Sequence, residues 1–220
     1  MAYRVRVWDL PTRLFHWLLA ACVVALVVTA KMGEMLWHER LGYAVLALLL
    51  FRLVWGLVGG HWSRFHTFVY APGSVLAYLR GRAHPDHVIG HTPLGAASVY
   101  AMLLVLLAQV GTGLFSDDEI AFTGPLNRFI STDAGLAATS YHRSWGQWLV
   151  VGLVVLHIAA IAWYAWRKRQ NLVRPMVVGD KEVPAAAKSS RDDATSRIAA
   201  AAVLAAAVGA VWWIRALGNG

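Results

Sequence analysis

Five apolar stretches, each long enough to cross a lipid bilayer, constrain this chain more than any other feature of its sequence. A spanning helix needs about 20 mostly apolar residues, because the hydrocarbon core of a bilayer is about 30 Å thick. The predicted spans are residues 10–30, 38–60, 93–115, 141–166 and 198–214. Only 15% of the residues are charged, which is well below the roughly 25% of soluble domains. The sequence therefore predicts an all-α integral membrane protein, with a four-helix transmembrane bundle and a fifth helix at the C-terminus.

Two of these stretches have a second interpretation. The first follows a basic start and would also fit a cleaved signal peptide. Pro11 suits the first turn of a retained helix, and His16 interrupts the apolar region that a signal peptide needs. We therefore expect an uncleaved span. The last stretch is at the short limit for a span, and the alternative is a helix that lies in the membrane interface.

The composition of the connecting segments divides the chain into three parts. Residues 1–168 form the predicted four-helix membrane domain, residues 169–197 a charged cytoplasmic linker, and residues 198–220 the C-terminal hydrophobic helix. The linker is rich in Ala, Lys, Ser and Asp, which predicts a flexible segment. Residues 61–92 are expected to be a polar loop with a short interfacial helix at GSVLAYLRG.

The distribution of Lys and Arg predicts the orientation of the spans, since cytoplasmic loops carry an excess of both. Fourteen of these residues lie in the N-terminal stretch, the loop at residues 61–92 and residues 167–197, which include the linker. The opposite side carries five, and Arg52 lies inside the second span. We therefore predict a multi-pass protein with a cytoplasmic N-terminus. The acidic loop at residues 116–140 would then face outward.

Charge and cysteine content exclude several classes of protein. The formal charge of +8 gathers in loops rather than on a helix face, which does not favour nucleic-acid binding. Cys22 is the single cysteine, so an internal disulfide and an iron–sulfur site are both excluded. The sequence has no C-x-x-C-H motif and thus no covalent attachment point for a c-type haem.

Four histidines in or at the ends of the spans sort into two pairs by depth. His16 lies early in the first span and His157 about nine residues before the end of the fourth, so both are near the cytoplasmic side. His38 and His142 begin the second and fourth spans on the outer side. Ionisable groups within a membrane are functional by default, because hydrocarbon does not satisfy them. Two imidazoles that face each other across a bundle are what a six-coordinate haem b needs.

Small residues follow three of these histidines by four positions, as a flat macrocycle against the helix would require. Ala20, Gly42 and Gly146 would lie one turn along the same helix face. The alternative is ordinary small-residue packing between membrane helices. Arg52 also has two interpretations: its side chain extends to the interface, or it pairs with an acidic cofactor group such as a haem propionate.

The other five histidines lie in the predicted cytoplasmic loop. They are His61, His66, His84, His87 and His91. The loose spacing of the last three and the absence of a nearby cysteine argue against zinc, and we expect solvated or interfacial side chains. His91, just before the third span, could instead line a quinone pocket or contact the inner haem.

Two segments of the sequence resemble a known family. Val7–Trp17, which reads VWDLPTRLFHW, is similar to the opening of the bacterial cytochrome b561 and nickel-hydrogenase cytochrome b family. Gly90–Phe122 resembles the third-helix region of that family. His38, followed fourteen residues later by Arg52, and the two histidines of the fourth span also fit. The resemblance covers about residues 5–168.

The resemblance implies a four-helix bundle of the bacterial inner membrane that binds two b haems and exchanges electrons with a quinone. His16 and His157 would ligate the cytoplasmic haem, and His38 and His142 the periplasmic haem. The separation of His142 and His157 is fifteen residues, one more than we expect in relatives. The sequence therefore departs from the family pattern in the helix face on which these two histidines lie. The linker and the fifth hydrophobic segment also lie outside the common core of the family.

We therefore predict a dihaem cytochrome b that carries electrons between the quinone pool (ubiquinone or menaquinone) and a periplasmic cytochrome c or oxidoreductase subunit. Asp117, Asp118 and Glu119 of the outer loop could steer a basic partner, although a solvated turn is the simpler explanation. The alternatives are the membrane anchor of a hydrogenase-type complex, a superoxide:quinone oxidoreductase, and a haem-free scaffold or transporter. Membrane lipid and a second copy in a homodimer are the remaining expected partners.

Overall fold

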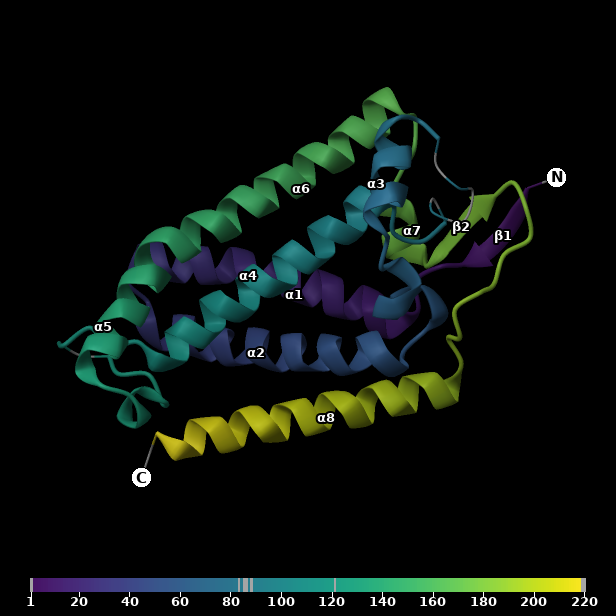
Figure 1. Cartoon of the computed structure of the whole chain (residues 1–220). Coiled ribbons are helices and arrows are strands. Elements are labelled where there is room, and N and C mark those ends of the chain that lie inside the picture. Colours follow the sequence, from purple (N-terminus) through teal and green to yellow (C-terminus); the bar gives the residue numbers. More distant parts are fainter. Residues whose placement is uncertain (1, 83, 85–86, 88, 121, 219–220) are drawn as a thin grey trace. The chain divides into compact units, whose positions relative to one another are not determined.

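Five long helices dominate the computed structural model, which describes residues 2–82, 84, 87, 89–120 and 122–218 (Figure 1). Each of the five is long and apolar enough to cross a membrane. They are α1 (Leu10–Met32), α2 (Met35–Val58), α4 (Pro93–Phe115), the continuous helical stretch from Thr132 to Arg167, and α8 (Ala194–Leu217). The predicted helical membrane fold with five spans is confirmed. The fifth helix has 24 residues rather than 17, because it continues beyond the apolar core at both ends.

The fourth span begins earlier than the sequence suggested. It consists of α5 (Thr132–Tyr141), the π-helical turn η5 (His142–Gly146) and α6 (Gln147–Arg167). The expectation of a loop as far as residue 140 was wrong. Ser131 caps α5, since its side chain accepts a hydrogen bond from the Ala134 amide. The start signal is thus a serine in front of a weakly apolar helix, and hydropathy alone does not detect it.

Short elements occupy the remaining chain. A short helix is present at the predicted place as α3 (Pro72–Leu79), and the single-turn helices η1 (His61–Ser63) and η2 (Phe65–Phe68) precede it. The helical turn η4 (Asn127–Phe129) lies before α5. The expectation of a flexible linker is corrected, because this segment contains α7 (Val173–Val178) and β2 (Asp180–Val183).

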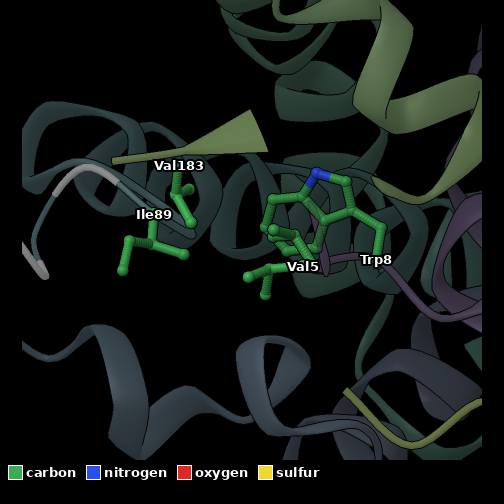
Figure 2. Close-up of a cluster of buried hydrophobic side chains, with 5 residues drawn as sticks. Val5, Trp8, Ile89 and Val183 are labelled. Atoms are coloured by element: carbon green, nitrogen blue, oxygen red, sulfur yellow. The ribbon is translucent and has the colours of Figure 1, made fainter. Parts of the chain in front are cut away.

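Contacts between residues group the chain into two compact units. The first comprises the chain up to Trp17, Arg52–Tyr100 and His157–Val203. Its small antiparallel sheet pairs β1 (Tyr3–Arg6) with β2, in a register that places Tyr3 opposite Val183. Apolar side chains from both strands and the loop before α4 form a buried cluster, shown in part in Figure 2. Its members are Val5, Val7, Trp8, Ile89 and Val183.

The linker is held against the N-terminal strand by polar contacts. The Ser190 amide donates to the Arg6 carbonyl at 2.7 Å, and the Ser190 hydroxyl donates to the Val7 carbonyl at 2.7 Å. The Asp192 carboxylate accepts from Arg6 at 2.7 Å and from the Leu10 amide at 3.2 Å. These partners lie more than 180 residues away in sequence, which explains why composition alone predicted a flexible segment.

Asp9 organises the start of α1 in this same unit. Its side chain is fully buried and accepts four hydrogen bonds at 2.8–3.2 Å. The donors are the Thr12 amide, the Trp55 indole, the Gly60 amide and the Ser63 hydroxyl. Asp9 is therefore both the N-cap of α1 and the group that ties α1 to the end of α2.

The second unit comprises Leu18–Phe51, Ala101–Leu156 and the chain from Leu204 onward. The loop after α4 is built on its own hydrogen bonds. The Asp117 amide donates to the Thr139 hydroxyl, and the Asp117 carboxylate accepts from the Glu119 amide, both at 2.8 Å. The Asp118 carboxylate accepts from the Phe122 amide at 2.8 Å. Two of the three acidic residues thus shape this turn, which agrees with the simpler explanation of their presence.

Candidate functional site

The structure brings the four predicted histidines together as two pairs, one in each compact unit. His16 of α1 and His157 of α6 lie with their ring centres 6.3 Å apart in the first unit. His38 of α2 and His142 of η5 lie with their ring centres 6.1 Å apart in the second. These are the pairs that depth in the membrane indicated. All four side chains are partly buried.

The two separations fit a metal atom held between the rings. Two imidazoles that ligate one metal from opposite sides have ring centres about 6 Å apart, since each metal–nitrogen bond is about 2 Å and each nitrogen lies about 1 Å from its ring centre. Aromatic rings in direct offset or edge-to-face contact also lie about 4.5–7 Å apart, so the separations leave room for a metal and agree with direct contact as well. Within the described residues no group of three or more His, Cys, Asp or Glu could hold a metal ion. A centre with one histidine from each side is therefore the arrangement that these pairs fit.

Backbone carbonyls orient both rings of the second pair. The Nδ1 atom of His38 lies 3.0 Å from the Leu26 carbonyl, and that of His142 lies 2.8 Å from the Gln109 carbonyl. A carbonyl only accepts, so Nδ1 carries the proton in both neutral rings and donates it. The lone pair of Nε2 then remains for a metal. Gly113 allows the close approach of α4, because an added Cβ would lie 3.0 Å from the His142 ring.

The π turn at His142 has a side-chain partner in Gln109. In a π turn the backbone hydrogen bonds close one residue later than in an α-helix, so the turn absorbs one extra residue. The Gln109 side-chain amide donates to the His142 carbonyl at 3.0 Å. A turn of this kind would accommodate the one extra residue between His142 and His157, relative to the separation that the family resemblance led us to expect.

The small residues beside the histidines have different surroundings. An added Cβ at Gly42 would meet nothing within 4 Å, so this position leaves room beside its helix. At Gly146 it would lie 1.9 Å from the Gln109 side-chain oxygen. The interpretation of Gly146 as open space for a macrocycle was wrong, because this glycine makes room for Gln109. Ala20 is exposed on α1.

The first pair contains a polar atom that no protein group satisfies. His16 Nδ1 is buried and has no hydrogen-bond partner among the described residues. A buried polar atom without a partner costs about 1–3 kcal/mol, and such atoms in native structures usually mark a ligand or a functional site. His157 and the edge of Trp17 surround the His16 ring. The donor set therefore suits a bound group rather than a structural contact.

Arg52 is buried rather than extended to the interface. Its residue is only 3% exposed, and its guanidinium lies over the Phe65 ring at 4.6 Å. The Nη1 atom has no hydrogen-bond partner in the part of the chain that the structure describes. A buried cation that lacks an ion pair is costly, so this geometry favours an anionic ligand. The interpretation of a side chain that reaches the interface is wrong.

Within the described part of this loop, no group of three or more His, Cys, Asp or Glu could hold a metal ion. His84 and His87 have ring centres 5.4 Å apart, whereas His91 packs on Phe68 at 4.3 Å and on Trp8 at 4.6 Å. Burial, and to a lesser extent Arg52, lowers the pKa of His91 to about 3. His91 is therefore neutral and part of an aromatic cluster, so the expectation of a solvated or interfacial side chain was wrong for it.

The sequence interpretation did not single out Asp9, which fixes the start of the helix that carries His16, or Gln109, which contacts His142. Asp9 precedes Pro11 at the start of a span, which is an N-cap signal. Gln109 is an amide within an apolar span, and polar groups in such positions have partners inside the protein. Both signals are visible in the sequence, but neither identifies the partner.

Comparisons with known proteins agree with this geometry. Residues 7–179 match the family model described as prokaryotic cytochrome b561. A probable Ni/Fe-hydrogenase 1 B-type cytochrome subunit of Escherichia coli K12 is 27% identical, over 69% of this chain and 80% of its own length. Probable Ni/Fe-hydrogenase B-type cytochrome subunits of Bradyrhizobium diazoefficiens and Azotobacter chroococcum are 25% and 27% identical, over 81% and 80% of this chain and 86% and 87% of their own lengths. No solved structure shows a significant match.

The family model spans most of the chain, including all four histidines of the two pairs and Arg52. Proteins of this family are membrane cytochromes of the b type, and the matched region contains four of the five candidate spanning helices, including those that carry the paired imidazoles. The chain therefore belongs to the prokaryotic cytochrome b561 family and is a multi-pass membrane cytochrome that binds haem b.

Proposed function

We propose that the chain holds two b haems, one between His16 and His157 and one between His38 and His142, and that it carries electrons across the inner membrane. The observation that carries this proposal is the presence of two histidine pairs with ring centres 6.3 and 6.1 Å apart. When bound, haem iron supplies one-electron chemistry, and the protein contributes ligand identity, hydrogen bonds and burial.

The side chains of this protein perform different tasks at the two sites. The Leu26 and Gln109 carbonyls fix the tautomers of His38 and His142, which keeps Nε2 available and the rings in one orientation. At the first site Arg52 offers a propionate a buried guanidinium whose Nη1 atom has no hydrogen-bond partner among the described residues. A positive charge in this place stabilises the more negative, reduced state of a centre nearby.

Quinone and a redox enzyme are the partners that we propose. The relatives bear the names of hydrogenase cytochrome subunits, so a partner enzyme of that general kind is favoured. A periplasmic cytochrome c remains our second candidate because Glu119 and its neighbours present negative charge, although Asp117 and Asp118 also serve the local turn. We further propose that the N-terminus is cytoplasmic, because fourteen Lys and Arg residues lie on that side against five.

Two experiments test this function. Addition of a ubiquinol or menaquinol analogue to the oxidised, purified chain in proteoliposomes should reduce haem, as followed by the α-band absorbance. Affinity purification from mild detergent should recover a redox enzyme whose subunits mass spectrometry identifies. A chain that no quinol reduces and that does not reduce a quinone would contradict the quinone step. Recovery of a c-type cytochrome in place of an enzyme would favour the second candidate.

A further inference from the structure

A basic pocket lies where α6 leaves the predicted membrane region. It encloses about 420 Å³ within the first compact unit, between the end of α6, α7 and the two-stranded sheet. Its charged lining residues are the cations Arg4, Arg169, Arg174 and Lys181 and the acids Asp180 and Glu182. None of these residues belongs to the histidine pairs, so the haem sites do not explain this pocket.

The charges in the pocket favour an anionic ligand. Asp180 is already engaged, because Arg4 and Arg6 both bind its carboxylate. Lys181 donates to the Ile89 carbonyl, and burial lowers the pKa of its amine. Arg169 and Arg174 have no carboxylate partner among the residues that the structure describes, whereas Glu182 is the one remaining acidic side chain of the lining.

The backbone holds these two arginines in fixed places. Arg169 adopts a left-handed conformation with φ of 54°, which ends the helix and costs a residue with a Cβ about 1–2 kcal/mol. The Gln170 amide then donates to the Tyr164 carbonyl at 3.0 Å. The Asn171 side chain accepts from the Val173 and Arg174 amides at 3.0 and 2.9 Å. The turn between α6 and α7 is therefore a defined structure that presents both guanidinium groups.

Exposed apolar residues lie close in sequence to Arg169 and Arg174, both before and after them. Trp166, in the last turn of α6, is 75% exposed. Val173 and Val177 of α7 are 43% and 54% exposed. Exposed tryptophan and valine beside arginine are typical of the membrane interface, where rings and short apolar side chains contact lipid and cations contact headgroups. A soluble phosphate compound would gain nothing from this apolar border.

We propose that this pocket binds the phosphate headgroup of an anionic phospholipid, with Arg169 and Arg174 in contact with the phosphate. The lipid is the source that the observations favour over free phosphate, because the pocket follows directly on a spanning helix and is bordered by exposed apolar side chains. Basic pockets at the ends of spanning helices take such headgroups. The site would fasten α7 and the β1–β2 sheet to the bilayer surface.

Native mass spectrometry of the full-length chain in detergent tests this site. Phosphatidylglycerol, phosphatidylcholine and inorganic phosphate are titrated separately into the delipidated protein. Phosphatidylglycerol should bind more tightly than phosphatidylcholine, and Arg169→Gln with Arg174→Gln should weaken its binding by about 30-fold at low salt. The matched control is Arg80→Gln with Arg82→Gln, which removes two exposed arginines from a different loop of the same unit.

Lysine substitutions keep the proposal testable if the double glutamine variant folds poorly. Arg169→Lys with Arg174→Lys retains both charges and should keep most of the lipid affinity. Equal binding of the two lipids, or an equal loss in the control variant, would overturn the site. Displacement of phosphatidylglycerol by millimolar inorganic phosphate would overturn the assignment to a lipid. Because no haem ligand is changed, these results are independent of the proposed electron transfer.

Discussion

Replacement of Asp9 by alanine should destabilise this protein more than any other single change at a non-ligand position. The side chain of Asp9 is fully buried and accepts from two backbone amides, an indole and a hydroxyl. Loss of an acceptor from a buried donor costs about 1–3 kcal/mol. One donor, the Thr12 amide, lies in the first turn of α1, where loss of the cap costs about 1 kcal/mol. Together these terms amount to about 4–10 kcal/mol of unfolding free energy.

An asparagine at position 9 should keep some of the four hydrogen bonds and lose others, which distinguishes the contributions of the two carboxylate oxygens. One carboxylate oxygen accepts from Thr12 and Trp55, and the other accepts from Gly60 and Ser63. The amide of asparagine keeps the first set, while its NH₂ group can donate to the Ser63 hydroxyl and conflicts only with the Gly60 amide. We therefore expect Asp9→Asn to cost less than half as much as Asp9→Ala.

The stability of both variants can be measured as the midpoint of thermal unfolding in detergent. The loss of the monodisperse peak in size-exclusion chromatography reports the unfolding. About 4 kcal/mol corresponds to a midpoint about 8–16 °C lower for a chain of this size. Asp133→Ala is the control, because Asp133 is an exposed acidic residue in the first turn of α5. A midpoint for Asp9→Ala within 2 °C of the wild type would refute the assigned role of Asp9, as would Asp9→Asn that is as unstable as Asp9→Ala.

Three further predictions concern the sites and the linker. Gln109→Leu removes the side-chain bond to the His142 carbonyl but keeps the backbone acceptor, so it should cost about 1 kcal/mol and alter the electron paramagnetic resonance signal of one haem only; two unchanged signals would contradict this. Arg52→Gln removes a buried positive charge and should lower the midpoint potential of one haem in a redox titration, with an unchanged or raised potential as the contrary result. Burial raises the pKa of Asp192, but the amide at the start of α1 and neighbouring arginines, Arg6 among them, outweigh it and hold that pKa below its usual range. Its contribution to stability is therefore complete above about pH 3.9 and is lost as the pH falls through the lower folded value. Hydrogen exchange of residues 184–193 should increase in that acidic range in the wild type, and Asp192→Asn should show the increase already at neutral pH.

The spans could be predicted because they depend on a local property, the length of an apolar run. The same holds for the grouping of histidines, since depth in a bilayer follows from position within a span. His38 and His142 are an example: they are more than a hundred residues apart, yet the sequence places both at the start of a predicted span on the same side. The family resemblance of the segment around His16 added the expectation of haem, which spacing alone left as one alternative.

Other features depend on contacts that no local pattern contains. The linker is ordered because Ser190 and Asp192 form hydrogen bonds with the N-terminal segment. Amino-acid composition does not reveal such long-range contacts. The π turn closes its backbone hydrogen bonds one residue later than an α-helix does, and hydropathy is insensitive to a shift of that size. Gly146 resembled space for a macrocycle until the position of Gln109 was known. Arg52 could not be assigned from sequence, because burial distinguishes its two interpretations.

The most direct test of two haems on four histidines is a haem count on the purified, full-length chain. The pyridine haemochrome assay, together with oxidised and dithionite-reduced spectra, should give about two b haems per chain. Alanine at His16 or His157 should leave about one, and alanine at His38 or His142 should remove the other. A colourless protein from haem-sufficient cells would contradict the account, and so would alanine variants at all four positions that each retain both haems.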